Sequence, residues 1–326
     1  MKKKALIFGV TGQDGSYLAD ILINKGYKVY GVYRKSSTGN LENLNHLIVD
    51  NKIFNKSFFL LKGDLLDVMA INRIIKEVRP DEVYNEADQD HVGWSYEIPG
   101  YSIDITATSV VKILEAIKLF QPEAKYFQPC SSNMFGITKQ KFQNEKSPFN
   151  PQSIYAIGKV SAFHTVNYYR SVFGLRCYCG IFYNHESPRR RLEYVSRKIT
   201  NTAARIYLKK QDYISLGDTN VTIDWGYAKE YMEVAYSIMQ LDTPDDFVIG
   251  TGYPYTLKNF LKDTFSFFGL NYKKHLKIDK KLFRPSKTSI LLADNSKLKK
   301  AIDFQPKIYG KKLVKLLAEY DLSIEK

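Results

Sequence analysis

The sequence IFGVTGQDGSYLA, residues 7–19, determines the fold class expected for this chain. An apolar run from Ala5 to Phe8 is long enough for one buried strand, and apolar residues at helical spacing follow the segment. Gly9, Gly12 and Gly15 therefore fall where a strand turns into a helix, and residues without a Cβ let a phosphate approach the backbone there. A helix N-terminus also offers free N–H groups and a partial positive charge to a pyrophosphate. The segment predicts a dinucleotide site rather than an ordinary glycine-rich turn.

Strands and helices are expected to alternate from this segment onward. Residues 1–35 have the pattern of a complete β-α-β unit, and the apolar pattern continues through the first half of the chain. Further strands are expected near 57–61, 81–86, 125–130 and 175–182, and helices near 67–78, 103–120 and 153–169. Such alternation is typical of parallel strands joined by right-handed crossovers. The predicted fold is a Rossmann-type α/β fold with a doubly wound parallel sheet.

A smaller α/β domain is expected in the C-terminal half. Its predicted helices lie near 192–209, 226–240, 256–268 and 311–323, and its predicted strands lie near 213–216 and 246–250. We expect a dinucleotide-binding domain over 1–183, interleaved with part of 217–245, and a mainly substrate-binding domain over 184–326. The second domain would close over the edge of the sheet and leave the substrate in the cleft.

The amino-acid composition and charge of the chain exclude several classes of function. The chain has 326 residues, of which 44% are hydrophobic, enough for a large core. No apolar run approaches the ~18 residues of a membrane span, and the run after the first lysines is too short for a signal peptide. The three cysteines lack C-x-x-C spacing and the histidines lack metal-ligand spacing, which favours a reduced, cytoplasmic protein without a metal site. The net charge of +14 comes from scattered lysines, so we expect an anionic substrate and neither nucleic acid nor a membrane as partner.

Arg34 indicates which dinucleotide binds. It follows the second expected strand, at 27–32, where an acidic residue would bind the ribose 2′-hydroxyl of NAD. A cation at this point instead accommodates the 2′-phosphate of NADP. The sequence therefore favours NADP over NAD, although a solvated loop arginine would look the same.

Tyr155 and Lys159 form the candidate catalytic pair. They are four residues apart in an expected helix and so share one of its faces. A lysine ammonium beside a phenol favours the phenolate and should lower the tyrosine pKa. With Ser131 at the end of an expected strand, the pair would provide a general acid or base for interconverting an alcohol and a ketone.

These residues together resemble the extended short-chain dehydrogenase/reductases, and within them the GDP-mannose 4,6-dehydratases. The resemblance covers nearly the whole chain. It rests on GVTGQDGSYLA (9–19), YRKSS (33–37), KGDLLD (62–67), FQPCSSNMFG (127–136), SIYAIGK (153–159), NHESPRR (184–190), DWGYAKEY (224–231), DDFVIGTG (245–252) and FRP (283–285).

The resemblance implies a bound NADP, a nucleotide-diphosphate sugar as substrate and a homo-oligomer, either a dimer or a tetramer. Tyr155 would deprotonate the sugar 4-hydroxyl while hydride leaves C4, Lys159 would bind the nicotinamide ribose, and Ser131 would hydrogen-bond near O4. The implied cofactor-binding residues are Gly9, Thr11, Gly12, Gln13, Asp14, Gly15, Arg34, Ser36, Asp64, Leu65, Ala87, Tyr155, Lys159, Asn184, His185 and Arg190. The implied substrate-binding residues are Asp90, Ser131, Asn184, Val195, Lys198 and Arg284.

Several residues depart from the family pattern. Asn133 replaces the glutamate that removes the C5 proton and helps expel the C6 hydroxyl, and a carboxamide is no useful base. Asp90 stands where a small polar residue is usual, and either a proton-transfer role or a structural cap would explain it. Ile223 replaces an arginine and Lys287 a glutamate near the nucleotide, whereas Arg191 adds positive charge in place of glycine.

Three functions follow from these observations. The first is a 4,6-dehydratase acting on GDP-mannose or a GDP-linked relative. The second is a sugar-nucleotide 4-oxidoreductase or epimerase that forms the 4-keto sugar without losing water, which agrees better with Asn133. The third is a protein that binds NADP without catalysis, which the intact Tyr155, Lys159 and Ser131 disfavour.

Overall fold

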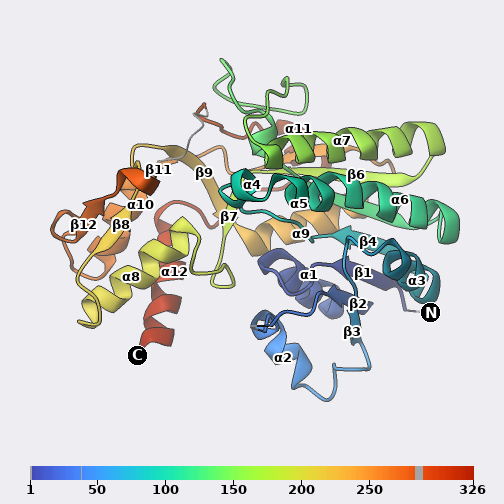
Figure 1. Ribbon diagram of the computed structural model, residues 1–326, viewed down its shortest axis with the longest axis horizontal. Coiled ribbons are helices and arrows are strands. Elements are labelled where there is room, and N and C mark those ends of the chain that lie inside the picture. Colours follow the sequence, from blue (N-terminus) through green and yellow to red (C-terminus); the bar gives the residue numbers. More distant parts are fainter. Residues whose placement is uncertain (1, 38, 283–288) are drawn as a thin grey trace.

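The computed structural model describes residues 2–37, 39–282 and 289–326. A large parallel sheet lies between two layers of helices, and a smaller unit lies beside its carboxyl edge (Figure 1). The first half contains β1 Lys4–Phe8, α1 Gln13–Asn24, β2 Lys28–Tyr33, α2 Asn45–Ile48, β3 Phe58–Lys62, α3 Val68–Val78, β4 Glu82–Asn85, α4 Trp94–Glu97, α5 Pro99–Ile103, α6 Ser109–Phe120, β5 Lys125–Ser131 and α7 Ile154–Phe173. The second half contains β6 Arg176–Phe182, β7 Asn184–Glu186, α8 Val195–Tyr207, β8 Ile214–Leu216, β9 Thr222–Tyr227, α9 Ala228–Met239, β10 Asp246–Ile249, β11 Pro254–Thr256, α10 Leu257–Phe267, β12 Leu276–Ile278, α11 Ser296–Ile302 and α12 Lys311–Glu325.

The strand order defines a doubly wound sheet. The seven strands run in the order β10-β6-β5-β4-β1-β2-β3, and all the pairs are parallel. The chain passes from β1 outward through β2 and β3, and then returns to build β4, β5 and β6 on the other side of β1. Open parallel sheets bind ligands at the carboxyl ends of the strands where the order reverses, which here is between β1 and β4. The predicted fold class is confirmed.

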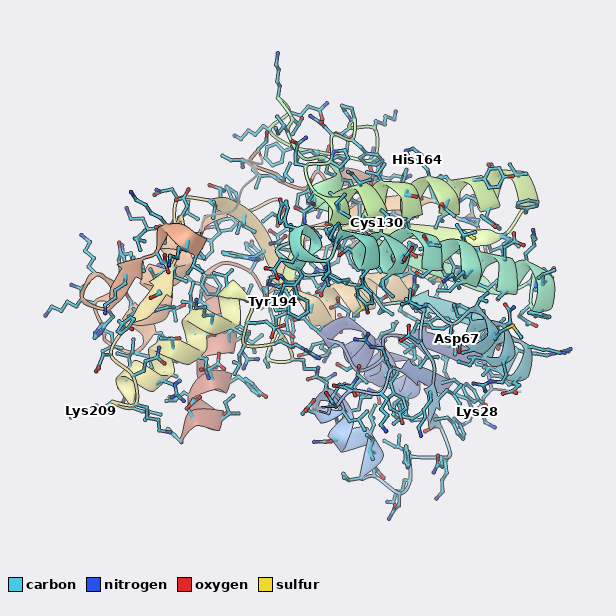
Figure 2. All side chains as sticks on the ribbon, in the orientation of Figure 1. Lys28, Asp67, Cys130, His164, Tyr194 and Lys209 are labelled. Atoms are coloured by element: carbon cyan, nitrogen blue, oxygen red, sulfur yellow. The ribbon has the colours of Figure 1, made fainter. Side chains whose placement is uncertain are left out.

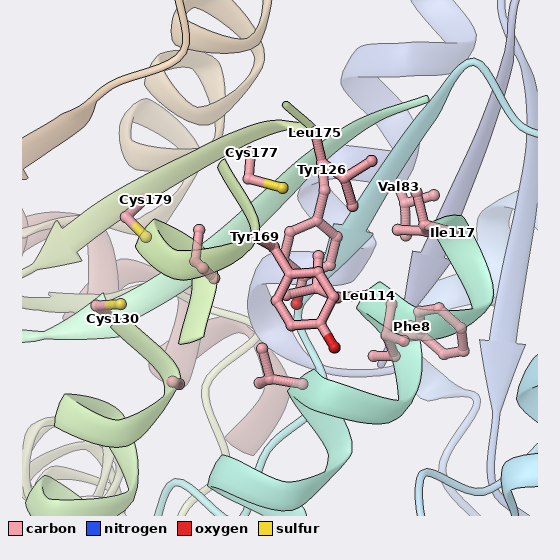
Figure 3. Close-up of a cluster of buried hydrophobic side chains, with 14 of the residues drawn as sticks. Phe8, Val83, Leu114, Ile117, Tyr126, Cys130, Tyr169, Leu175, Cys177 and Cys179 are labelled. Carbon is pink, nitrogen blue, oxygen red and sulfur yellow. The ribbon is translucent and has the colours of Figure 1, made fainter. Parts of the chain in front are cut away.

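Two hydrophobic cores hold the helices against the sheet. One core joins the sheet to α3, α6 and α7, and the other joins it to α1, α9 and α11. Figure 3 shows the first core, in which Tyr126 of β5 and Tyr169 of α7 pack near side chains of α6. Cys130, Cys177 and Cys179 are free and buried in this core. This confirms that Cys177 and Cys179 pack as small apolar side chains.

The smaller unit has its own core beneath α8, α10 and α12. It contains the parallel pair β8–β12, while β11, β9 and β7 form a three-stranded sheet beside it. The strand at 246–249 differs from expectation, because it pairs with β6 at the edge of the large sheet instead of joining the smaller unit. Strands β7, β9, β11 and β12 were not predicted, since most are only three residues long and depend on partners distant in sequence.

The helix expected over 103–120 is divided. Helix α5 ends at Ile103, a π-helical turn follows over Asp104–Thr108, and α6 begins at Ser109. A π-turn inserts an extra residue into a helix and is frequent at functional sites. Here it directs the Thr106 hydroxyl at Asp88 Oδ1, 2.6 Å away.

Candidate active site

The glycine turn after β1 is too crowded for side chains. Gly9 has a φ of +76°, and a Cβ on it would lie 2.5 Å from the Glu86 carbonyl oxygen. A Cβ on Gly15 would overlap the carbonyl oxygen of Gly9. Helix α1 begins at Gln13 without a side-chain cap from Gly12, which leaves its first N–H groups for an anion. This geometry fits a diphosphate group.

Tyr155 and Lys159 occupy the same face of α7, near the carboxyl end of β5. Lys159 Nζ lies 5.7 Å from the centre of the Tyr155 ring, and both side chains are buried. Ser131 ends β5 and is also buried. The structure therefore brings together the three residues that the sequence analysis grouped as catalytic. Asn133 is half-buried beside them, and its backbone N–H donates to Ser131 Oγ over 3.2 Å.

The expected lowering of the Tyr155 pKa is wrong. Burial raises the pKa of Tyr155 to about 12, Lys159 and Ser131 lower it, and Asp88 and Asp90 raise it. The sequence analysis took the ammonium as the dominant influence. Burial and the two carboxylates outweigh it, so the phenol keeps its proton at neutral pH.

Lys159 is already held by the protein. Its Nζ donates to the Pro129 carbonyl oxygen over 2.7 Å and lies 2.7 Å from Asp88 Oδ2. Burial alone would lower the pKa of Lys159, but Asp88 and Tyr155 raise it overall. The lysine is therefore a fixed, charged group at the carboxyl edge of the sheet.

Two further acids follow β4 at this edge. Glu86 is half-buried, and its buried Oε1 has no hydrogen-bond partner within the described part of the chain. Burial and the nearby Asp14 raise the pKa of Glu86 well above its usual value, against the opposing effect of Lys159. Asp90 accepts a 2.7 Å hydrogen bond from the Tyr194 hydroxyl and lies 3.2 Å from Arg190. Asp90 thus links the loop after β4 to the segment before α8, where Figure 2 places Tyr194.

Several implied cofactor residues contact one another at the start of α1. Asp14 Oδ2 lies 2.9 Å from His185 Nε2, and Gln13 Nε2 donates to the His185 carbonyl oxygen over 3.2 Å. Arg190 lies over the Tyr194 ring, 3.7 Å from its centre. The Thr11 carbonyl oxygen accepts a hydrogen bond from Asn43. These contacts connect the glycine turn to β7 and the segment after it.

The other implied cofactor residues in this half of the chain lie at the carboxyl ends of β2, β3 and β4. Arg34 is exposed, and its guanidinium donates to the Tyr101 hydroxyl over 2.8 Å. Asp64 Oδ1 accepts from the Leu66 N–H, and Leu65 is buried. Ser36 and Ala87 are half-buried in the adjoining loops.

The implied substrate residues are more widely spread. Asn184 is exposed at the start of β7, and Val195 is the first residue of α8. Lys198 lines a cavity of about 440 Å³ with Thr202 and the segment 211–215. The predicted position Arg284 lies outside the described residues, as does Lys287.

Sequence reasoning missed Asp88 and Glu86. The available signal was the run of acids in NEADQDH, residues 85–91, at the end of an expected strand. Within the described ranges no group of three or more His, Cys, Asp or Glu residues could hold a metal ion. No helix among these residues is long and apolar enough to cross a bilayer.

The fold and the grouped Ser131, Tyr155 and Lys159 define a short-chain dehydrogenase/reductase of the extended type. Solved structures agree on the fold. The TM-score is 0.86 to UDP-glucose 4-epimerase from Thermotoga maritima, at 22% identity over 99% of this chain and 100% of that one. It is 0.82 to dTDP-glucose 4,6-dehydratase from Bacillus anthracis in complex with NAD, at 21% identity over 99% and 96% of the two chains.

Sequence comparisons then identify the family. The family model described as GDP-mannose 4,6 dehydratase matches residues 6–317. GDP-mannose 4,6 dehydratase 1 of Arabidopsis thaliana is 43% identical over 100% of this chain and 91% of that protein. GDP-mannose 4,6-dehydratase of Vibrio cholerae is 37% identical over 99% and 95%. The chain belongs to the GDP-mannose 4,6-dehydratase family. The prediction that it is an enzyme, a nucleotide-sugar 4,6-dehydratase or a related short-chain dehydrogenase or epimerase, is confirmed.

Proposed function

We propose that this enzyme modifies a nucleotide-diphosphate sugar, GDP-mannose or a GDP-linked relative, through a 4-keto intermediate. The observation that carries the proposal is the grouping of Tyr155, Lys159 and Ser131 at the carboxyl end of β5, the strand next to β4, where an open parallel sheet binds its ligands. The curated relatives with the same whole-chain match are named GDP-mannose 4,6-dehydratases.

The three side chains have distinct roles in this proposal. The Tyr155 phenol exchanges a proton with the sugar 4-oxygen, and the Ser131 hydroxyl hydrogen-bonds to the same oxygen. Lys159, fixed by Pro129 and Asp88, holds a ribose hydroxyl and supplies positive charge beside the phenol. The raised pKa of Tyr155 favours its role as a proton donor at neutral pH, and its action as a base should increase as the pH rises.

The proposed cofactor is NADP. The glycine turn would hold its diphosphate, Arg34 its 2′-phosphate, and Lys159 its nicotinamide ribose. When bound, it supplies a hydride acceptor and donor for the sugar C4. Arg34 is exposed at the carboxyl end of β2. The turn that it begins, RKSS at residues 34–37, contains no acidic residue, and this supports NADP over NAD.

Asn133 favours a second candidate function, a 4-oxidoreductase or epimerase that loses no water. Asn133 stands directly after the Ser131-Ser132 pair, where the family places its elimination base, and an amide cannot accept the C5 proton near neutral pH. Asp90 is the alternative base. Each of its oxygens contacts one partner, Tyr194 or Arg190, and its side chain is 47% exposed, which leaves acceptor sites open to a sugar.

The nucleotide end of the substrate is assigned to the smaller unit. The cavity beside Lys198 is lined by polar groups, including Thr202 and Asp212, and would accept a phosphate or base edge.

A homo-oligomer is also proposed. It is supported by large apolar side chains exposed on α6 and α7, namely Val111, Leu119, Ile157, Tyr168, Val172 and Phe173. Light scattering at several protein concentrations tests the oligomer. We expect a mass of two or four chains in a buffer of neutral pH and physiological ionic strength.

Mass spectrometry of the products tests the function. The protein is incubated in deuterated water with NADP and a panel of sugar nucleotides that includes GDP-mannose and a GDP-heptose. A product lighter by one water establishes a dehydratase. A product of unchanged mass apart from exchange, or one lighter by two hydrogens with reduced cofactor, establishes the second candidate. Absence of any product or cofactor reduction across the panel contradicts both.

A further inference from the structure

A buried salt bridge ties α7 to the loop after β4. Lys159 Nζ and Asp88 Oδ2 lie 2.7 Å apart, and their side chains are only 5% and 11% exposed. The same ammonium donates to the Pro129 carbonyl oxygen at the end of β5. Three separate elements therefore meet at this one lysine, immediately beside the Tyr155 ring.

Asp88 is itself held in place by two donors. The Thr106 hydroxyl and the Gln89 N–H donate to its Oδ1 over 2.6 and 2.8 Å. Thr106 belongs to the π-turn before α6, and that turn packs closely on α7, since a Cβ on Gly158 would lie 3.0 Å from Thr106 Cβ. With Oδ1 occupied, Oδ2 is left to face the ammonium. The carboxylate is thus oriented by the fold and is no chance partner on a flexible surface.

The charge of Asp88 opposes the usual effect of a lysine on a neighbouring phenol. An ammonium alone stabilises the phenolate. A carboxylate 2.7 Å from that ammonium opposes its field at the phenol. The influences on the pKa of Tyr155 agree with this, because burial raises that pKa most, Lys159 lowers it, and Asp88 raises it again.

Other charged and titratable groups face this pair, and none replaces Asp88. Asp90 also raises the pKa of Tyr155, but it is bound to Tyr194 and Arg190. Burial raises the pKa of Glu86 well above its usual value, which favours its uncharged form. Ser131 and Cys130, both on β5, face Tyr155 and Lys159 respectively.

We propose that Asp88 is a positioning residue of the Tyr155–Lys159 pair: it fixes the ammonium and opposes the effect of its charge on the neighbouring phenol. The consequence for catalysis rests on the proposed function. A neutral phenol protonates the oxygen of a 4-keto sugar at neutral pH, whereas removal of a proton from the 4-hydroxyl should become faster as the pH rises.

Nuclear magnetic resonance of the ligand-free protein tests this without a substrate. The protein is labelled with ¹³Cζ-tyrosine, and Tyr155→Phe identifies the Tyr155 signal. A midpoint near the value of about 12 leaves only roughly 1% phenolate at pH 10. Since one nearby charge shifts a pKa by about one to three units, Asp88→Asn should raise that fraction about tenfold or more.

Glu115→Gln is the matched control. Glu115 contacts Lys118 over 2.6 Å and the Tyr169 hydroxyl over 2.5 Å, so it is another Tyr–Lys–carboxylate group, located near the other end of α7. This variant should leave the Tyr155 signal unchanged. Asp88→Glu, which restores the carboxylate, should return the signal toward that of the unmodified protein.

Two results would overturn the proposal. One is a Tyr155 signal at pH 10 that is the same in Asp88→Asn and the unmodified protein, both folded by circular dichroism. The other is an equal change in Glu115→Gln, which would indicate a general charge effect. Asp88→Ala replaces Asp88→Asn if the amide folds poorly. Because no sugar is present, a failure of the proposed function, seen as no turnover of any sugar nucleotide, remains distinguishable from a failure of this inference.

Discussion

Asp14 and His185 form a polar pair that joins the start of α1 to β7, with 2.9 Å between Oδ2 and Nε2. His185 Nδ1 also lies 2.8 Å from the Tyr183 carbonyl oxygen. Burial alone would lower the pKa of His185, but Asp14 and the carbonyl raise it overall. Burial would raise the pKa of Asp14, but His185 and Arg190 lower it. Each partner therefore favours the charged form of the other.

The pair should stabilise the protein in a defined pH window. His185 contributes fully below the unfolded histidine pKa of about 6.5 and loses its contribution as pH rises through its raised folded pKa. Asp14 contributes above the unfolded pKa of about 3.9 and loses its contribution as pH falls through its lowered folded pKa. We expect His185→Gln to lower the Tm by about 2–4 °C at pH 6, equivalent to about 1 kcal/mol, and by less at pH 9.

Calorimetry at both pH values measures this difference. His164→Gln is the control, because His164 contacts Phe149 and Phe163 and no carboxylate, on the outer part of α7 (Figure 2). An equal loss of Tm at pH 6 and pH 9 for His185→Gln would show that the charged pair contributes nothing.

Tyr155→Phe should remove the acid–base group while leaving the fold intact. The ring still fills its buried site on α7, so the Tm should change little. The rate of the chemical step should fall by about 10²- to 10⁴-fold, the usual contribution of general acid–base catalysis. Tyr169→Phe, on the same helix but bonded to Glu115, is the control and should retain activity. Cofactor affinity measured by calorimetry should be unchanged in both variants, and a large loss in Tyr155→Phe would assign the tyrosine to binding instead.

The sequence predicted those parts of the site that lie within one local segment. The turn with Gly9 and Gly15 and the helical spacing of Tyr155 and Lys159 depend on neighbours in the chain, and both are present in the structure. The Asp88–Lys159 pair joins residues far apart in sequence, through a strand order and a π-turn that no periodicity reveals. The predicted direction of the Tyr155 pKa shift is wrong for the same reason, because that pKa depends on burial and on Asp88, a carboxylate that is remote in sequence and close in space.

Among the charged residues of the smaller unit, Asp321 should cause the largest loss of stability when it is replaced. Its side chain is fully buried and receives hydrogen bonds from Arg197, the shortest of 2.6 Å, and from the Thr200 hydroxyl. Removing one partner of a buried ion pair leaves the other charge uncompensated, which costs about 3–5 kcal/mol. We expect Asp321→Ala to lower the Tm steeply by detaching α12 from α8. Glu319→Gln, an exposed position paired with Lys315 on the same helix, should change the Tm by little. Similar Tm values for the two variants would contradict this account.

Arg34 should determine the preference of the enzyme for NADP⁺ over NAD⁺. Loss of a charge-assisted contact to a phosphate should weaken NADP⁺ binding by about ten- to a hundredfold in Arg34→Ala, with little effect on NAD⁺. Isothermal titration of each dinucleotide measures the ratio directly. Arg73→Ala removes an exposed arginine that pairs with Glu77 on α3, and it controls for the loss of one positive charge. An equal effect of Arg34→Ala on NAD⁺ and NADP⁺ would mean that Arg34 does not contact the 2′-phosphate.

Asn133→Glu tests whether this one residue separates the two candidate reactions. The Asn133 backbone N–H donates to Ser131 Oγ, so the side chain of a glutamate at this position would extend from a fixed backbone beside the proposed sugar site. If the native protein forms a 4-keto sugar without losing water, the new carboxylate should supply the missing base and produce dehydrated product at least tenfold faster. Mass spectrometry in deuterated water detects both the loss of water and the solvent deuterium gained. Asn133→Gln has the same length without the charge and should give no dehydrated product. If Asn133→Gln and Asn133→Glu behave alike, the base lies elsewhere, and Asp90 becomes the residue to replace next, since breaking its contact with Tyr194 would expose a carboxylate to the same cleft.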